Sequence, residues 1–187
     1  SLTECLVFGA RAGRAAAEFV EQAGPVGRAV EAQVRDEERR LYEDFLGMTD
    51  GTERIATLRA EMQTTMEEGA GIYRTGATID VAEEALAGLR RRVRHLRLDD
   101  RSRTFNTELM AALELGYMLD LAEVILRSAA LRTESRGAHQ RTDYPDRDDE
   151  RFLAHSLAQR ATDGSAQIEY LPVTITKWPP GDRVYGR

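Results

Sequence analysis

Hydrophobic residues recur every three to four positions through most of this chain, which is the pattern of amphipathic α-helices that pack on one another. The loops between these segments are short and carry Gly, Asp and Thr, so neighbouring helices are expected to run antiparallel. The predicted helices cover residues 1–24, 27–46, 52–69, 78–97 and, after a capping Asn106, 107–131. The positions expected to face the core are Val30, Val34, Leu41 and Phe45, then Ile55, Leu58, Met62 and Met66, then Val81, Ala85, Leu89, Val93 and Leu96.

The first predicted helix starts at the first residue of the sequence. Ser1 and Glu4 have the spacing of a capping box, and Gly24 followed by Pro25 indicates the end of the helix. Because a natural protein rarely begins on an N-cap, Ser1 is expected to continue a longer polypeptide. The single cysteine, Cys5, lies in this apolar run and is expected to be a buried, reduced thiol in a cytosolic setting.

The period of hydrophobicity changes near the C-terminus. A short helix is expected over residues 148–159, and after it the segments QIEY and VTIT alternate apolar and polar residues as strands do. Asp163 and Gly164 are a turn signal just before these segments, and Pro179 and Pro180 cannot continue a sheet because they lack the amide hydrogen. The predicted fold class is mainly α: an antiparallel helical bundle with a long buried helix and a small C-terminal β-hairpin, followed by an extended tail.

Composition excludes two classes of partner. The formal net charge is -6, and the basic residues are scattered rather than gathered on one stripe, so no nucleic-acid partner is expected. No apolar run approaches the roughly 20 residues that a membrane span needs, and no signal sequence opens the chain. Any contact with a membrane is therefore expected to be indirect.

A dense run of charges follows the most apolar predicted helix. Between Arg132 and Arg151, eleven of twenty residues are charged, and residues of both signs are interleaved. Such a segment could be a catalytic cluster, a metal site or a self-neutralising structural loop. The candidate metal ligands have spacings that match no recognised site, so no metal is expected. These ligands are His139, Asp143, Asp148, Asp149 and His155.

Two groups within this run have both a structural and a chemical interpretation. Asp148 and Asp149 stand at the start of a predicted helix, where acidic side chains complement the exposed amides. The second group surrounds a glycine that could form a tight turn and so aim the side chains. A mutually paired loop is favoured there over a proton-transfer site. This second group is Glu134, Arg136, His139 and Arg141, around Gly137.

Several segments, taken in order, resemble the C-terminal part of the flavoprotein subunit of fumarate reductase and succinate dehydrogenase. SLTECLVFGARAG is similar to the last flavin-facing helix of that family, and MEEGAGIYRT to its bundle signature. FNTELMAALELGYMLDLAEVILRSAALRTESRGAH resembles its long helix and the following loop, and IEYLPVTITKWPPGDRVYG resembles its terminal hairpin and tail. The resemblance covers essentially the whole chain. MEEGAGIYRT, GAHQR and the RVYG ending look closer to bacterial fumarate reductases than to succinate dehydrogenases.

The resemblance implies a domain layout and a cofactor. Residues 1–24 would be the terminal helix of an upstream FAD-binding domain, residues 25–160 a helical bundle domain, and residues 161–187 the β-hairpin and extended tail. Ser1 and Leu2 match the family's Asn-Ser-Leu motif, so their backbone amides would bind the pyrimidine side of the flavin of FAD. The positive end of the helix dipole would stabilise the anion that forms on the reduced flavin. The family's catalytic residues lie upstream of Ser1, so none is assigned here.

The resemblance also implies a function for the complete subunit: FAD-dependent interconversion of fumarate and succinate, with electrons passed to an iron-sulfur subunit. Membrane anchor subunits would be contacted only indirectly, on the cytoplasmic side of the inner membrane. This chain would serve as a scaffold and subunit-docking domain, inactive alone, with its charged run forming a cross-paired surface buried within or between subunits. Two alternatives stay open: a fragment of an L-aspartate oxidase-like flavoenzyme, which the VTITKWPPGDRVYG ending disfavours, and an autonomous protein-interaction bundle.

Overall fold

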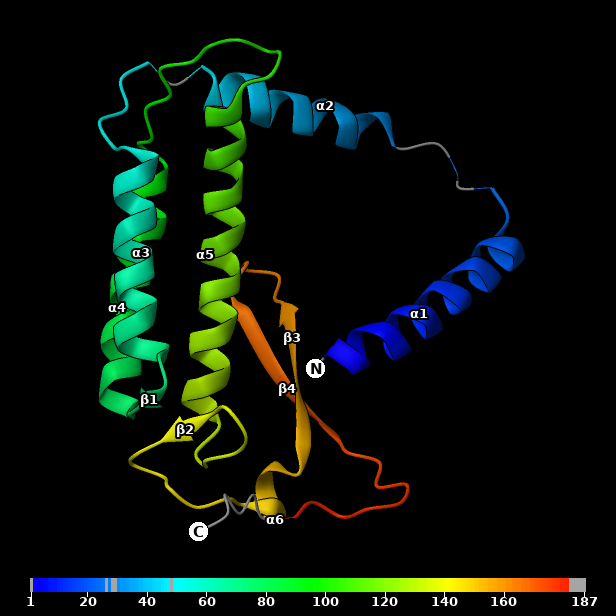
Figure 1. Cartoon of the computed structure of the whole chain (residues 1–187). Helices are drawn as coiled ribbons and strands as arrows, with labels where there is room; N and C mark the ends of the chain where they lie inside the picture. Colours follow the sequence, from blue (N-terminus) through cyan, green and yellow to red (C-terminus); the bar gives the residue numbers. More distant parts are fainter. Residues whose placement is uncertain (1, 26, 28–29, 48, 182–187) are drawn as a thin grey trace. The chain divides into compact units, whose positions relative to one another are not determined.

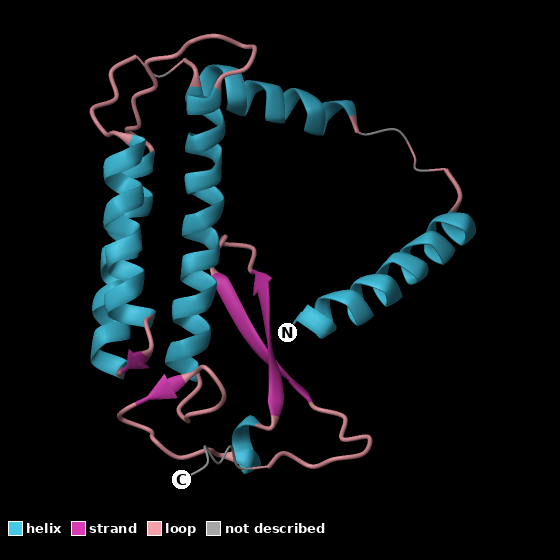
Figure 2. Ribbon diagram, viewed as in Figure 1, coloured by secondary structure: helices cyan, strands magenta, loops and turns pink. Residues whose placement is uncertain are grey.

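The computed structural model describes residues 2–25, 27, 30–47 and 49–181, and it divides into two compact units, Ser1–Glu43 and Asp44–Arg187. The chain is mainly helical, and a small antiparallel sheet lies near its C-terminus (Figures 1 and 2). The predicted fold class is therefore confirmed.

The first unit consists of helices that bury none of their described side chains. Helix α1 spans Leu2–Ala23 and ends at Gly24, whose φ of 70° confirms the predicted helix end. Helix α2 spans Glu31–Arg39 and continues as a π-helix, η1, over Arg40–Phe45. The Cys5 thiol is exposed, so the prediction of a buried thiol is wrong. The described part of this unit has no second layer that could cover the apolar face of α1.

The second predicted helix starts later than its apolar pattern suggested. Residues 27 and 30 lie outside α2, which begins at Glu31, and residues 26, 28 and 29 lie outside the described residues. Val30 has an extended backbone at the N-cap position, and it makes no side-chain capping bond. Val30 and Val34 are 58% and 47% exposed, so their assignment to the core is wrong.

Three antiparallel helices build the core of the second unit. They are α3 (Ile55–Ala70), α4 (Gly76–Val93) and α5 (Thr107–Leu131), and they lie side by side with α4 running opposite to its two neighbours (Figure 1). This confirms the antiparallel bundle. The large apolar side chains at its centre are Leu58, Met62, Ile79, Leu86, Leu89, Leu96, Leu98, Leu115, Leu119 and Leu126.

Helix α4 follows the predicted core positions only towards its C-terminal end. Leu89 and, just after the helix, Leu96 are buried as predicted, and Val93 packs against the core. Ile79, Ala82 and Leu86 are also buried, whereas Val81 is 69% exposed. Ala85, predicted to face the core, is also exposed. Both stripes have helical spacing, so the periodicity alone could not choose between them. Packing against α3 and α5 makes the choice.

Helix α5 begins as predicted, because the Asn106 side chain accepts a 2.7 Å hydrogen bond from the Leu109 amide. One face of the helix is fully buried against α3 and α4, which confirms the long buried helix. Its buried residues are Ala112, Leu115, Leu119, Ala122, Leu126 and Ala129.

The C-terminal hairpin starts one strand earlier than predicted. Strand β3 (Ala154–Arg160) pairs antiparallel with β4 (Ala166–Pro172), and Gly164 turns between them with a φ of 85°. The helix predicted over 148–159 is limited to α6, Asp149–Phe152. VTIT is not a strand. The helical pattern of residues 148–159 covers too few residues to outweigh the ladder of hydrogen bonds with β4. That ladder joins residues distant in sequence, so the local pattern does not predict it.

A second, parallel pair of very short strands was not predicted. Strand β1 (Tyr73–Arg74) follows α3, and it pairs with β2 (Gln140–Arg141) in the charged run. The pair brings two segments that are remote in sequence to the same end of the bundle (Figure 2). None of the described helices combines the length and the apolar character that crossing a membrane requires.

Candidate functional site

Glu134 lies at the centre of the charged run, and it is fully buried. Its Oε1 accepts hydrogen bonds from Arg132 Nη1 at 2.6 Å and Arg136 Nε at 2.7 Å. Its Oε2 accepts from Arg136 Nη2 at 2.9 Å and from the Asp148 amide at 2.8 Å. Burial by itself would raise the pKa of Glu134, but these donors together hold the pKa below its usual value. The group is therefore a paired carboxylate rather than a proton donor.

We refer to the ion pairs around this residue as the arginine–carboxylate cluster. Arg136 also contacts the Asp149 carboxylate at 2.7 Å, and the hydrogen bonds that Arg136 donates to Glu134 raise the pKa of its guanidinium. Three arginines of the cluster are paired with three carboxylates, and a fourth arginine, Arg147, also reaches Asp149 at 3.1 Å. The members of the cluster are Arg132, Glu134, Arg136, Arg141, Asp143 and Asp149.

Arg132 connects the end of α5 to the hairpin. Its guanidinium donates to the Phe152 carbonyl at 2.9 Å and to the Ala154 carbonyl at 2.7 Å. The same guanidinium stacks on the Phe152 and Tyr170 rings, with centroid distances of 5.4 and 5.6 Å. The planar shape of arginine serves both contacts at once, so lysine could not replace it.

Arg141 and Asp143 join the ends of two helices. Arg141, only 2% exposed, donates from Nη1 to the Ala129 carbonyl at 2.9 Å, in the last turn of α5. Its Nε and Nη2 form a bidentate pair with Asp143, whose Oδ2 also accepts from the Gly76 amide at the start of α4. The hydrogen bond from Arg141 is the main reason why the pKa of Asp143 lies far below its usual value. Each charge faces the helix end whose dipole it complements.

His139 is held by partners on both ring nitrogens. Nε2 lies 3.0 Å from the Arg132 carbonyl oxygen, and Nδ1 lies 3.0 Å from Arg74 Nη1. The carbonyl can only accept and the guanidinium can only donate, so this geometry requires a neutral ring protonated on Nε2. Burial lowers the pKa of His139, and the charges of Arg74, Arg141 and Arg132 lower it further. No ring nitrogen is left to exchange a proton with a substrate.

The predicted pairing of the charged run is therefore confirmed. Glu134, Arg136 and Arg141 each bind an oppositely charged neighbour. Asp148 caps α6 by accepting from the Arg151 amide at 2.9 Å, which matches the structural interpretation of the acidic pair. Within the described ranges, no group of three or more His, Cys, Asp or Glu side chains is arranged to hold a metal ion. The sequence could not reveal Arg74, the partner of His139, because the two residues lie 65 positions apart.

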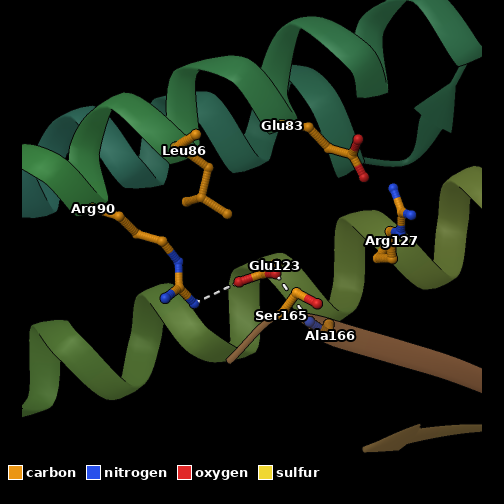
Figure 3. Close-up of a pocket in the computed structure, with 8 residues that line it drawn as sticks. Glu83, Leu86, Arg90, Glu123, Arg127, Ser165 and Ala166 are labelled. Atoms are coloured by element: carbon orange, nitrogen blue, oxygen red, sulfur yellow. Dashed lines mark hydrogen bonds and ion pairs between the residues drawn. The ribbon is translucent and has the colours of Figure 1, made fainter. Parts of the chain in front are cut away.

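A cleft of about 320 Å³ lies between α4, α5 and the hairpin turn (Figure 3). Arg90 reaches across it to Glu123 at 2.7 Å, and the other oxygen of Glu123 accepts from the Ala166 amide at 3.1 Å. Glu83 and Arg127 lie at the other end of the cleft (Figure 3). The central charges thus attach the hairpin to the bundle. No pattern in the sequence indicated this cleft.

The predicted flavin contacts lie in the first unit. Leu2 is the first residue of α1, and it is 82% exposed. Ser1 lies outside the described residues. The first amides of a helix have no partners within the helix, and they carry partial positive charge, which suits the anionic side of a reduced flavin.

The sequence of this chain matches a known protein family and several known proteins. Residues 59–185 match the family described as "Fumarate reductase flavoprotein C-term". The fumarate reductase flavoprotein subunit of Mycobacterium tuberculosis is 56% identical over 192 residues, covering 100% of this chain and 33% of the relative. The succinate dehydrogenase flavoprotein subunit of Rickettsia bellii is 36% identical, covering 99% and 32%.

A solved structure agrees in fold over nearly the whole chain. The FrdA chain of E. coli quinol fumarate reductase superposes with a TM-score of 0.88 at 45% identity, covering 99% of this chain and 32% of that chain. The chain thus spans about a third of the length of the relatives that it matches.

Proposed function

Because this chain belongs to the fumarate reductase flavoprotein C-terminal family, we propose that it is the scaffold and subunit-docking part of an FAD-dependent flavoprotein that interconverts fumarate and succinate. The observation that carries this proposal is the 56% identity to a fumarate reductase flavoprotein subunit over the whole chain. The 36% identity to a succinate dehydrogenase flavoprotein subunit is lower, which favours fumarate reduction.

The geometry of the second unit supports a structural role for this chain in the proposed flavoprotein. Glu134 and Arg141 are buried, and both are committed to hydrogen bonds with neighbouring segments. The nitrogens of His139 are committed as well. Both oxygens of Glu134 and both ring nitrogens of His139 are engaged, so these groups can hold the bundle and the hairpin in place but are not available to a substrate. In this proposal the chain alone is inactive.

The cofactor contact is assigned to the start of α1. Residues 1–24 are taken as the terminal helix of the FAD-binding domain, and the backbone amides of Ser1 and Leu2 as donors to the flavin. The exposure of Leu2 is compatible with this role. FAD supplies the hydride and electron chemistry when it is bound. The helix end supplies positive potential, which stabilises the negative charge of the reduced ring.

The partners follow from the same assignment. The proposed docking partner is an iron-sulfur subunit, and membrane anchor subunits are reached only through it, on the cytoplasmic side of the inner membrane. The match to a chain of a quinol fumarate reductase supports partners of this kind. No described helix is both long enough and apolar enough to cross a membrane.

A chimeric flavoprotein tests the proposed function. In it, this chain replaces the matching third of the M. tuberculosis fumarate reductase flavoprotein subunit. We expect the chimera to retain FAD and to oxidise a reduced viologen dye when fumarate is added. The remaining two thirds of the M. tuberculosis subunit, expressed without this chain, is the control and should lack activity. A folded chimera that retains FAD but does not reduce fumarate would contradict the proposal.

The flavin contact can be tested separately at Leu2. Proline is tolerated in the first turn of a helix but has no amide hydrogen, so Leu2→Pro removes one donor without breaking α1. Leu2→Ala removes the same side chain but keeps the amide, and it is the matched control. We expect a lower midpoint potential of the bound flavin in the proline variant of the chimera than in the alanine variant. Equal potentials would reject the contact.

A further inference from the structure

Phe105 is unusual in two independent ways. Its ring is 97% exposed, more than any other large hydrophobic residue in the described part of the chain. Its φ of 54° is the only positive value among the described residues other than glycine. A left-handed backbone is unfavourable for a residue with a Cβ, and an aromatic ring left in water gives up its burial energy as well. Neither cost is offset by a contact that Phe105 makes in this chain.

The strained conformation is held by the neighbouring residue. Asn106 is 7% exposed, and its Nδ2 donates to the carbonyls of Asp100 and Ser102, both at 2.9 Å. Its Oδ1 caps α5 by accepting from the Leu109 amide. Phe105 is therefore fixed between a buried side chain and the start of a long helix.

The base of the loop is hydrogen-bonded as well. The Glu108 carboxylate accepts from the amides of Asp99 and Asp100, both at 2.8 Å. Strain persists only where the surrounding structure enforces it, and it is concentrated at functional sites. Pre-ordering an aromatic side chain in its bound position reduces the entropy cost of association.

We propose that Phe105 is a preformed anchor that inserts into an apolar pocket on the part of the flavoprotein polypeptide that this chain does not span. This inference rests on the proposed function. Buried aromatic anchors of this kind dominate the binding energy of protein interfaces.

The exposed apolar surface continues from Phe105 along α5, so its extent favours a large binding partner. Beginning one turn after Phe105, α5 carries a second apolar stripe opposite its buried face, and a helix that is apolar on both sides is normally covered on both sides. The relatives are about three times as long as this chain, so they contain enough polypeptide to cover such a surface. The exposed stripe consists of Met110, Tyr117, Leu121 and Ile125.

The net charge of the segment around Phe105 disfavours a membrane as the binding partner of this surface. Residues 97–108 carry three basic and three acidic side chains, so the segment has no net positive charge to attract anionic lipid.

The accessibility of Phe105 provides the direct test. Hydroxyl-radical footprinting compares the oxidation rate of the Phe105 ring in this chain alone and in the chimera with the M. tuberculosis two thirds. We expect rapid oxidation in the chain alone and strong protection in the chimera. Equal oxidation in both would overturn the proposal. So would protection that appears only after an iron-sulfur subunit or anionic phospholipid vesicles are added, because the pocket would then lie elsewhere.

Variants at the same position give the energetic test. In the chimera, Phe105→Ala should increase the rate of proteolysis about tenfold or more. Loss of the anchor raises the population of the locally opened state, which is the state that the protease cleaves. Phe105→Leu should restore most of the resistance because it refills the pocket, and neither change should affect proteolysis of the chain alone. Identical proteolysis of the chimera and its alanine variant would overturn the proposal. Fumarate reduction is measured in parallel, so an active chimera with an exposed Phe105 rejects the anchor and leaves the proposed function intact.

Discussion

Helices α1 and α5 are both long and rich in apolar residues, but only α5 buries its apolar residues in a core. The 22 residues of α1 include no buried side chain, although Leu6 and Phe19 are apolar. The 25 residues of α5 contribute six buried positions to the core. The difference does not lie in helix-forming tendency. A helix supplies an apolar face, but only a second layer of structure turns that face into a core.

The ion pairs of the two units differ in the same way. In the first unit Arg39 pairs with Asp36, and Arg40 with Glu37, each three positions along one exposed helix. In the second unit Arg132 and Arg136 converge on the buried Glu134 between separate elements. Exposed pairs of the first kind contribute little, whereas breaking a buried pair is strongly destabilising.

The largest expected effect comes from removing the buried carboxylate. Glu134→Gln should lower the free energy of unfolding of this chain by about 4 kcal/mol, because it leaves two guanidinium groups without their shared anion. Glu37→Gln in the first unit is the matched control and should leave the urea midpoint unchanged. Equal midpoints for the wild type and Glu134→Gln would show that the cluster does not stabilise the bundle.

Core packing should give the next largest effect. Leu126 is fully buried, so Leu126→Ala should cost about 3 kcal/mol through lost contacts and the cavity left behind. Leu6 is 76% exposed, and Leu6→Ala should not destabilise this chain in thermal or urea unfolding. A comparable loss for Leu6→Ala would mean that α1 has a packing partner within the chain in solution.

Helix capping should have a smaller effect, of opposite sign in the two units. Asn106→Ala removes the cap of α5 and should cost about 1–2 kcal/mol in urea unfolding. Val30 occupies the N-cap of α2 without a capping bond, so Val30→Asn should raise the helicity measured by circular dichroism. If Asn106→Ala unfolds at the wild-type urea concentration, or Val30→Asn leaves helicity unchanged, local capping does not limit these helices.

The smallest expected effect is a pH dependence specific to His139. The folded pKa of His139 lies below its ordinary value of 6.5, so between these two values the unfolded chain binds the extra proton more readily. The contribution to stability is therefore complete above pH 6.5, and it is lost as the pH falls from 6.5 through the folded pKa. Urea unfolding from pH 7.5 to 5 should show this decline in the wild type and a weaker decline in His139→Gln.

A spectroscopic measurement tests the assignment of the His139 ring. An Nδ1-protonated ring at His139 in a ¹⁵N spectrum at neutral pH would contradict the hydrogen-bond assignment.

Local patterns were enough to predict much of this protein. The helical spacing of the three bundle helices, the Asn106 cap and the Gly24 end are properties of neighbouring residues, and each was confirmed by the structure. The same is true of the Asp163 and Gly164 turn and of the mutual pairing of charges within the charged run. The family followed from motifs that are contiguous in sequence.

Only the tertiary structure decided that Ile79 and Leu86 rather than Val81 are buried in α4. Likewise, only the tertiary structure decided that Cys5 is exposed and that residues 154–160 form a strand. It also decided that His139 meets Arg74 and that Glu134 meets two guanidinium groups. The physical reason is the same in each case. Periodicity and capping depend on atoms a few residues apart, whereas burial, strand pairing and pKa depend on segments that approach one another only when the chain has folded.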